Sequence, residues 1–477
     1  MRVKMILPAL TEAKSPYWRP IKYSLFPPLG LATLAGYLDP DDPVVLQDEH
    51  VETLDLEDAP DLVLIQVYIT NAFRAYALAD YYRSRGAHVA LGGLHVTSLP
   101  EEAAVHADTL FLGPAEEAFP RFLADFRRGQ TEKVYVSRSR SLVDLPLLRR
   151  DLIRRSRYFV PNSLVVTRGC PHRCDFCYKE AFFEGGRSFY TQPVEQALTE
   201  IERLPGKHLY FLDDHLLGNR RFARELFAGL KGMKRVFQGA ATVDSILRDD
   251  LIERAAEAGL RSLFVGFETL SEDNLRSSSK FQNLGQDYAR AIQRLHDLGI
   301  MINGSFVFGL DHDGPDVFQR TVDWGIRMGL TTATYHILTP YPGTSLFQRL
   351  EAEGRILHRD WPRYDTRQVV YQTQGLSAEA LQQGYDWAYR EFYAWSRIWQ
   401  SAAQHSDFKH RLKHLAYTSG WKKFEPVWNF LIKHELLGHT RSWLETVLAE
   451  VKPTFSGSQE SGGSTGPVQR INEVTRF

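Results

Sequence analysis

Short apolar runs alternate with amphipathic stretches from residue 1 to about residue 130. A strand of a buried parallel sheet is a continuous apolar run, whereas a covering helix repeats its apolar positions every three to four residues. The alternation therefore predicts an α/β domain with a parallel sheet covered by helices. The predicted strands are Val3–Leu7, Pro43–Gln47, Leu62–Tyr68, Val89–Gly92 and Thr109–Gly113, and the predicted helices are Gly30–Leu38, Ala72–Ser84 and Glu117–Arg127.

Five strands in this rhythm suit a flavodoxin-like or Rossmann-like sheet, whose ligand lies beyond the carboxyl ends of the strands. No G-x-G-x-x-G fingerprint follows the first strand, which argues against a dinucleotide. Glycines do stand at later strand ends, among them Gly92 and Gly93. A missing side chain lets the backbone approach a large flat ligand closely, although each glycine alone is equally typical of an ordinary turn.

A second region, residues 161–345, repeats strand then helix six times at a spacing of about thirty residues. This repeat predicts a partial (β/α)6 barrel, with its chemistry at the carboxyl ends of the strands as in the eight-fold barrel. The predicted strands are Leu164–Thr167, Leu209–Leu212, Phe237–Thr242, Leu263–Phe267, Ile302–Gly309 and Thr334–Leu338, and the predicted helices include Val194–Leu204, Phe222–Leu230 and Leu247–Ala258.

The other stretches have weaker patterns. Residues 131–160 predict an arginine-rich linker that is solvated or wraps between the domains. Residues 346–452 predict a mostly helical cap, and residues 453–477, rich in Ser and Gly, predict a disordered tail. An aromatic stripe at helical spacing is usually core, but this one could also close the open barrel and shape a substrate pocket. It comprises Trp387, Tyr389, Phe392, Tyr393, Trp395 and Trp399, followed by Trp421, Trp428 and Trp443.

Composition narrows the classes of partner. The formal net charge is −1 and the pI is about 7.0, so no global field favours nucleic acid or an anionic membrane. No stretch approaches the roughly 18 apolar residues that a transmembrane segment needs. The first residues lack the apolar length of a signal peptide and are typical of a first strand. We therefore expect no nucleic acid partner and no transmembrane segment.

The three cysteines of the chain are Cys170, Cys174 and Cys177, which gives the spacing C-x3-C-x2-C. Iron–sulfur cubanes are usually held by four thiolates, so three would leave one iron open to an outside ligand. Structural zinc with His172 as fourth ligand is the alternative, but it would crowd four ligands more tightly than paired zinc knuckles do. An odd number at such low density disfavours a disulfide framework.

The run from Arg168 to Tyr178 resembles the cysteine loop of radical S-adenosylmethionine (SAM) enzymes. The resemblance implies that three irons of a [4Fe–4S] cluster are held by the cysteines and that the fourth chelates SAM. An electron from the cluster then cleaves SAM to a 5′-deoxyadenosyl radical. Scarce, clustered cysteines and an oxygen-sensitive cofactor favour the cytoplasm, and a reductase, flavodoxin or ferredoxin would supply the electron.

The same resemblance assigns roles to residues near the strand ends. It implies that Phe176 and Tyr178 lie near the adenine, although loop packing is the ordinary role of such rings. Asp213 and Asp214 would lie near the SAM amino group, Glu268 would contact SAM, and Phe308 would lie beside the adenine. A structural ion pair is the alternative for Asp213 and Glu268, and packing is the favoured role for Tyr335 and His336.

The N-terminal loops resemble the cobalamin-binding domain of class B radical SAM proteins. Four segments match in the family's order: Pro27–Gly36, Gln66–Thr70 with Arg74–Asp80, Gly92–Thr97 with Pro100–Glu102, and Ala107–Gly113 with Glu116–Glu117. The resemblance implies that cobalamin is bound by Tyr68, Thr70, Asn71, Arg74, Gly92, Gly93, His95, Gly113 and Glu116.

One departure bears on the cobalt. Many cobalamin proteins carry D-x-H-x-x-G, whose histidine ligates the metal, but here Asp48-Glu-His50 follows the second strand and lacks the glycine. His50 is therefore interpreted as a loop or core residue. We expect no histidine below the cobalt, with the Tyr68–Arg74 loop facing it and His95 lining the nucleotide tail.

These resemblances predict a cobalamin-dependent radical SAM methyltransferase acting on an unactivated carbon of a small-molecule or natural-product substrate. By family analogy, one SAM methylates the cobalamin and a second provides the radical that activates the substrate. The aromatic cap hints at a large hydrophobic substrate, although core packing explains it equally well. Two alternatives remain open: a cyclase, ring-contraction or oxidation enzyme with the same cofactors, and a non-catalytic cobalamin or SAM sensor.

Overall fold

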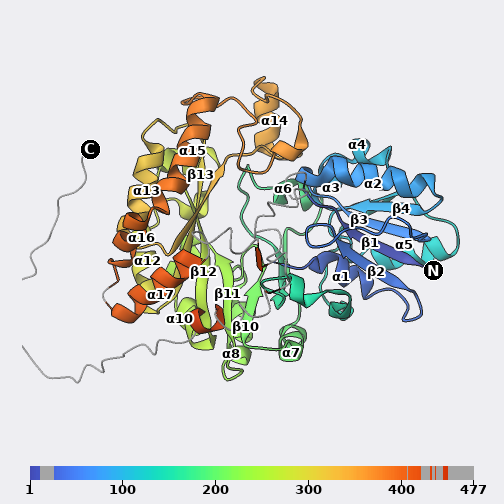
Figure 1. Cartoon of the computed structure of the whole chain (residues 1–477), viewed down its shortest axis with the longest axis horizontal. Helices are drawn as coiled ribbons and strands as arrows, with labels where there is room; N and C mark the ends of the chain where they lie inside the picture. The colour runs from blue at the N-terminus through green and yellow to red at the C-terminus, as the bar shows by residue number, and fades with distance from the viewer. Residues whose placement is uncertain (11–25, 406, 421–429, 432–435, 437–443, 449–477) are drawn as a thin grey trace, which may run out of the picture.

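Two parallel sheets with their covering helices form the molecule (Figure 1). The computed structural model describes residues 1–10, 26–405, 407–420, 430–431, 436 and 444–448. In Figure 1 the N-terminal domain, in blue, lies on one side and the second sheet, with its yellow to red helices, lies on the other. None of the helices in the described part of the chain combines the length and apolarity that crossing a bilayer requires.

The N-terminal sheet has six parallel strands in the order β2-β1-β3-β4-β5-β6. The first five follow the flavodoxin-like order, in which the direction of winding reverses between β1 and β3. This confirms the predicted fold class, and β1 and α2 have the predicted bounds. The elements are β1 (Val3–Leu7), α1 (Leu29–Ala35), β2 (Val44–Asp48), β3 (Leu62–Gln66), α2 (Ala72–Ser84), β4 (His88–Gly92), α3 (Leu94–Ser98), α4 (Pro100–Ala104), β5 (Thr109–Leu112), α5 (Phe119–Arg127) and β6 (Val134–Val136).

The sixth strand lies inside the stretch that the sequence predicts as a linker. β6 pairs in parallel with β5, and the buried Tyr135 in it donates a hydrogen bond to Asp125 of α5 at 2.7 Å. Three residues are too few to show a period. The arginines of this stretch also bind: Arg150 contacts Glu200, and Arg157 contacts Glu52. The stretch therefore ties the two domains together.

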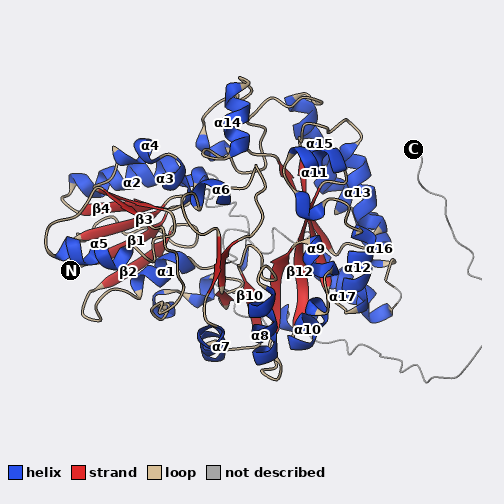
Figure 2. Cartoon of the chain, turned by 180° about the vertical axis from the view of Figure 1, so that it is seen from behind, coloured by secondary structure: helices blue, strands red, loops and turns tan. Residues whose placement is uncertain are grey.

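The second sheet also has six parallel strands, in the order β14-β13-β12-β11-β10-β7. The partial (β/α)6 barrel is thereby confirmed, and Figure 2 shows its helices packed along the outer face. One predicted helix, Leu247–Ala258, corresponds to α10 (Leu251–Ala258), which begins four residues later and is preceded by the short helix α9 (Val243–Leu247). The elements are β7 (Ser163–Leu164), α7 (Val194–Arg203), β10 (His208–Phe211), α8 (Arg220–Leu230), β11 (Val236–Ala241), α9 (Val243–Leu247), α10 (Leu251–Ala258), β12 (Leu260–Glu268), α11 (Glu272–Ser277), α12 (Tyr288–Asp297), β13 (Met301–Phe308), α13 (Val317–Arg327) and β14 (Thr332–Ile337).

The predicted strand Leu164–Thr167 would end directly before the cysteine loop, residues 168–178, but β7 ends at Leu164 and another strand intervenes. After β7 the chain forms β8 (Thr167–Gly169), which pairs in antiparallel fashion with β9 (Phe189–Thr191) outside the barrel sheet. The three cysteines and α6 (Lys179–Phe182) lie between these two strands. The small ribbon therefore closes the base of the loop.

The C-terminal region contains α14 (Ser345–Ala352), α15 (Ala378–Phe392), α16 (Trp395–Ala402) and α17 (Phe408–Thr418). The helices α15 and α16 pack on the barrel side and α17 packs on α16, whereas the buried residues of α14 belong to the apolar cluster of the N-terminal domain. Tyr389 and Tyr393 donate hydrogen bonds to the carbonyls of Tyr335 and Ala333 in β14, at 3.1 and 2.8 Å. This part of the aromatic stripe is core, whereas Trp399 is 61% exposed. Trp421, Trp428, Trp443 and the predicted disordered tail lie outside the described residues.

Candidate functional site

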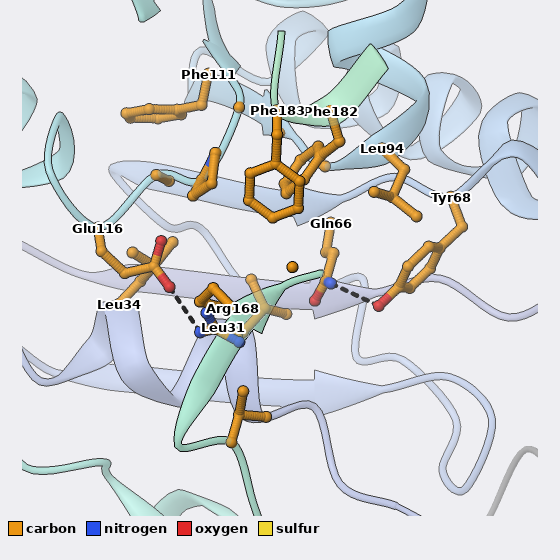
Figure 3. Close-up of a pocket in the computed structure, with 18 of the residues that line it drawn as sticks. Leu31, Leu34, Gln66, Tyr68, Leu94, Phe111, Glu116, Arg168, Phe182 and Phe183 are labelled. Carbon is orange, nitrogen blue, oxygen red and sulfur yellow. Dashed lines mark hydrogen bonds and ion pairs between the residues drawn. The ribbon is translucent and has the colours of Figure 1, made fainter. Parts of the chain in front are cut away.

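The loops after the N-terminal strands face the cysteine loop and the start of the barrel. A cavity of about 320 Å³ lies between them (Figure 3). We call it the glycine cavity because Gly30, Gly92, Gly93 and Gly113 line it. Of the N-terminal candidates from the sequence, Tyr68 and Glu116 line it as well.

Two of the glycines at this edge need their glycine backbone. Gly93 has φ +121°, and a Cβ built there would stand 2.6 Å from the carbonyl oxygen of Val67, so the two loops pack tightly at this point. Gly113 also has positive φ, at +76°. A larger residue at either position would be strained, since L side chains rarely adopt such backbone. Together the four glycines leave this wall of the cavity without side chains, which fits a bulky cofactor such as cobalamin.

The opposite wall comes from the barrel side. Figure 3 shows Phe182 and Phe183 beside Leu94 in the upper part of the view, with Tyr68 to their right. Below them the guanidinium of Arg168 contacts the Glu116 carboxylate at 2.6 Å. Although burial opposes the charge of Arg168, Glu116 outweighs it and holds the arginine pKa above its ordinary value. This ion pair connects the N-terminal domain, through Glu116, to the start of the cysteine loop at Arg168.

The cysteine loop lies beside two lysines. Cys170 and Cys174 are buried and Cys177 is half-buried. Burial raises the pKa of Cys177 to about 11, and the charge of Lys179 acts in the opposite direction. Burial also raises the pKa of Cys174, which Lys280 opposes. Because thiols bind metal as thiolates, cations at this position fit an anionic thiolate-bound cluster such as [4Fe–4S].

Glu268 pairs with the lysine that faces the cysteines. Its carboxylate accepts a hydrogen bond from Lys280 Nζ at 2.7 Å, and both side chains are largely buried. Burial opposes the charge of Lys280, but Glu268 outweighs it and raises the lysine pKa. Glu268 has φ +64° and follows a register shift between β12 and β13. Positive φ is rare outside glycine and is concentrated at functional sites.

The two aspartates after β10 differ in environment. Asp213 is buried and accepts hydrogen bonds from the backbone N–H groups of Val166 and Thr167, which fixes the approach to β8. Burial raises its pKa to about 7. Asp214 is exposed, lines the glycine cavity and accepts a hydrogen bond from the Tyr178 hydroxyl at 2.9 Å. Tyr178 thus connects the cysteine loop to the cavity.

A second cavity, of about 450 Å³, adjoins the first. We call it the tyrosine cavity because Tyr68, Tyr178, Tyr341 and Tyr364 line it. It shares Tyr68, Leu94 and Tyr178 with the glycine cavity. Thr70, Asn71 and His95, which the resemblance assigned to cobalamin, lie here instead of in the glycine cavity, and so does His50. His50 also contacts Asp48 at 2.7 Å.

Three other candidates lie apart from both cavities. Arg74 forms an ion pair with Glu49 at 2.6 Å. Phe176 packs against the apolar cluster beneath α2. The ring of Phe308 stacks on Tyr335 in the barrel core, because alternate residues of a strand face opposite sides. Its predicted place beside an adenine is therefore not supported, and Val307 is the residue that faces the N-terminal side.

Several site residues had no assigned role in the sequence. Arg168 stands in the cysteine motif itself, and its position before Gly169 was the available signal. Gln66 was only part of the matched segment Gln66–Thr70, and its hydrogen bond to Tyr68 follows from the strand end they share. Lys280 gave no signal, because its partner Glu268 is brought close only by the fold. Phe182 and Phe183 also had no assigned role, and only the fold brings them to the cavity.

His172, the alternative zinc ligand, stacks on His215 with ring centroids 5.7 Å apart. Within the described residues no three side chains of His, Cys, Asp or Glu are arranged to hold a single metal ion. A cubane binds each cysteine through a different iron, so its thiolates need not converge on one point.

Family models match both domains of the chain. The Radical SAM superfamily model matches residues 164–325, and the B12 binding domain model matches residues 23–123. Two solved structures share the fold. One is the radical S-adenosylmethionine methyltransferase TsrM from Kitasatospora setae with cobalamin and a [4Fe–4S] cluster bound, with a TM-score of 0.63 and 14% identity over 93% of this chain and 100% of that chain. The other is the cobalamin-dependent S-adenosylmethionine radical enzyme OxsB with aqua-cobalamin bound, with a TM-score of 0.64 and 16% identity over 94% of this chain and 75% of that chain.

Three curated proteins are similar in sequence. The bacteriochlorophyllide d C-12(1)-methyltransferase of Chlorobaculum tepidum is 29% identical over 351 residues, which is 71% of this chain and 76% of that protein. The C-8(2)-methyltransferase of the same organism is 26% identical over 390 residues, 78% and 86%. An anaerobic magnesium-protoporphyrin IX monomethyl ester cyclase of Cereibacter sphaeroides is 25% identical over 266 residues, 54% and 42%. With a B12-binding domain and a radical SAM domain in one chain, the protein belongs to the cobalamin-dependent radical SAM enzymes.

Proposed function

We propose that this protein is a methyltransferase that adds a methyl group to an unactivated carbon of a small molecule. One observation carries the proposal: Tyr178 and Asp214 belong to the cysteine-loop side and line the cavity whose other wall is the glycine edge. The two halves therefore open on one space. The curated relatives with the longest matches given above are methyltransferases.

The residues divide the work. Cys170, Cys174 and Cys177 would hold the cluster, and the glycine cavity would hold part of the cobalamin. When bound, these groups and SAM supply a methyl group and a carbon-centred radical. Glu268 and Asp214 are the carboxylates placed to orient the amino group of SAM, because both lie at carboxyl ends of barrel strands.

Other side chains shape and protect the space. Phe182 and Phe183 form an apolar wall that excludes water from the side of the glycine cavity. The Arg168–Glu116 pair holds the cysteine loop against the N-terminal edge. Lys179 and Lys280 offset the negative charge of the thiolates. These residues position and insulate; none is assigned a bond-making step.

The test separates two uses of SAM. Protein reconstituted anaerobically with iron, sulfide and cobalamin is given SAM and a chemical reductant. We expect both S-adenosylhomocysteine, from methyl donation, and 5′-deoxyadenosine, from reductive cleavage. Cobalamin-dependent S-adenosylhomocysteine is the decisive product, and its absence would contradict the methyltransferase proposal.

A cyclase is the second candidate, because the magnesium-protoporphyrin ester cyclase matches over half of this chain. A cyclase would form 5′-deoxyadenosine without S-adenosylhomocysteine. A sensor would form neither product. The same assay therefore separates all three functions.

Two further expectations accompany the proposal. The radical step needs one electron at a time, so a reductase, flavodoxin or ferredoxin is the proposed donor. The clustered free cysteines favour a reducing compartment, the cytoplasm.

A further inference from the structure

The tyrosine cavity contains two buried hydrogen-bond acceptors that the protein does not satisfy. In the described part of the chain, His95 Nδ1 and Asp365 Oδ2 have no hydrogen-bond partner, and both residues line this cavity. Buried polar atoms are nearly always paired, because an unpaired one loses its hydrogen bonds to water and gains none in return. Two such atoms in one cavity indicate that a ligand completes them.

The neighbours of His95 select the tautomer of its neutral ring. Its Nε2 lies 2.9 Å from Glu102 Oε1, and the Trp361 indole N–H donates to Glu102 Oε2 at 3.0 Å. Burial opposes ionisation of Glu102, but the hydrogen bonds from His95 and Trp361 outweigh it and lower its pKa. The ionised carboxylate accepts a hydrogen bond from Nε2–H, so in the neutral imidazole the lone pair lies on Nδ1.

Asp365 stands on the other wall, in the segment between α14 and α15. Its Oδ1 accepts the backbone N–H of Arg367 at 2.9 Å, which fixes the carboxyl group. The adjacent Thr366 has φ +64°, and its hydroxyl lies 3.1 Å from His336 Nδ1. The loop is thus held over the end of β14, with Oδ2 of Asp365 left for a ligand.

The remaining lining is mostly apolar or already paired. Leu7, Leu10, Ile69, Leu94 and Pro342 supply carbon surface. The polar side chains of four other lining residues have partners within the protein: Asn71 with Pro8, Ser98 with Leu94, Tyr178 with Asp214, and Tyr364 with His358. A ligand of this cavity would therefore have to donate hydrogen bonds to His95 Nδ1 and Asp365 Oδ2 and otherwise contact apolar side chains.

We propose that the tyrosine cavity binds the substrate, and that the substrate is a largely apolar molecule with hydroxyl or amine N–H donors. One donor bonds to His95 Nδ1 and another to Asp365 Oδ2. The inference rests on the proposed function in that the bound molecule is the one acted on. His95 is then a substrate-binding residue and not part of the cobalamin site.

Two matched probes test the demand for a donor. They are 2-naphthol and 2-methoxynaphthalene, which share a ring frame but differ in that only the former donates a hydrogen bond. Their dissociation constants are measured by calorimetry on protein loaded with cluster and cobalamin. We expect wild-type protein to prefer 2-naphthol by about fivefold to tenfold, the equivalent of one hydrogen bond.

The variants locate that preference. If the hydroxyl of 2-naphthol uses both acceptors, Asp365→Leu and His95→Phe should each reduce the preference for 2-naphthol toward unity. If the hydroxyl uses only one acceptor, only the variant that removes that acceptor should reduce the preference. Asp360→Leu removes an exposed carboxylate five positions away and should leave it unchanged. Asp365→Leu leaves the Glu102 network intact, so it keeps the test informative if His95→Phe fails to fold.

Three results would overturn the inference. The first is that wild-type protein binds neither probe or shows no preference. The second is that both variants keep the wild-type preference. The third is loss of bound cobalamin, seen by its absorbance, from Asp365→Leu or His95→Phe, since the cavity would then belong to the cofactor. None of these readouts depends on SAM turnover, so the methyltransferase proposal stands or falls separately.

Discussion

The two edges that meet in this protein are both carboxyl ends of parallel sheets, yet they are built differently. The N-terminal edge is lined by Gly30, Gly92, Gly93 and Gly113, which leave the cavity wall without side chains. The barrel edge is made with ionisable side chains, including the buried pair of Lys280 and Glu268. One edge is specified by space and the other by charge.

The difference matches what each edge has to hold. A large preformed cofactor is recognised by a surface that makes room for it, and glycine provides room most directly. A thiolate-bound cluster carries charge, so its surroundings must place cations and carboxylates at fixed positions. The contrast predicts that substitutions at one edge affect one cofactor and spare the other.

The largest effect is expected at the cysteine loop. Cys174→Ala removes a thiolate from the cluster, so formation of 5′-deoxyadenosine should fall below detection. Bound cobalamin, measured by absorbance, should remain at the wild-type level. Survival of SAM cleavage would show that the cluster assignment is wrong.

The corresponding test of the N-terminal edge is Gly93→Val. A side chain at φ +121° and within 2.6 Å of the Val67 carbonyl oxygen must displace backbone, so we expect cobalamin affinity to fall by at least about a hundredfold. Iron content should be unchanged. Gly129→Val is the control, because that glycine also has positive φ, +68°, but nothing within 4 Å of an added Cβ. Equal cobalamin loss in both variants would contradict a role for space at Gly93.

A smaller effect is expected when the buried pair is broken. Glu268→Gln leaves the Lys280 charge buried without its counter-ion, which should lower the free energy of unfolding by about 3 kcal/mol. Adding Lys280→Met should restore part of that loss. Denaturant unfolding of the cofactor-free single and double variants measures both. A double variant less stable than Glu268→Gln would argue against an unpaired charge as the cause.

The smallest effect concerns pH and Asp213. Burial raises its pKa to about 7 in the folded protein, against about 4 in an unfolded chain. The stability that this residue contributes is complete below about pH 4 and is lost as the pH rises through 7. Asp213→Asn should therefore flatten the fall in melting temperature between pH 5 and pH 8. The neighbouring Asp214→Asn should keep the wild-type slope, and a slope unchanged in Asp213→Asn would contradict the buried carboxyl.

The sequence predicted the framework well because its signals were local. β1 and α2 were placed to the residue, and the cysteine spacing is specific to its family. β6 was missed because three residues show no period, and β8 because its partner β9 comes about twenty residues later. Local pattern identifies elements better than it identifies pairings.

The site was predictable only where a motif carried it. Gly92, Gly93 and Glu116 line the glycine cavity, whereas His95 lines the tyrosine cavity and Phe308 lies in the core. Lys280 and Asp365 gave no signal, since each acquires its meaning from residues far away in sequence. Side-chain direction depends on register within a strand, and a shift of one residue reverses it.

The central claim is that cluster and cobalt occupy one shared space. Electron paramagnetic resonance of protein reconstituted with both cofactors and partly reduced tests it directly. We predict that the Co(II) signal relaxes faster, or is split, in the presence of the paramagnetic reduced cluster, and that Cys174→Ala abolishes this effect. A Co(II) signal that is identical with and without the reduced cluster would contradict the account.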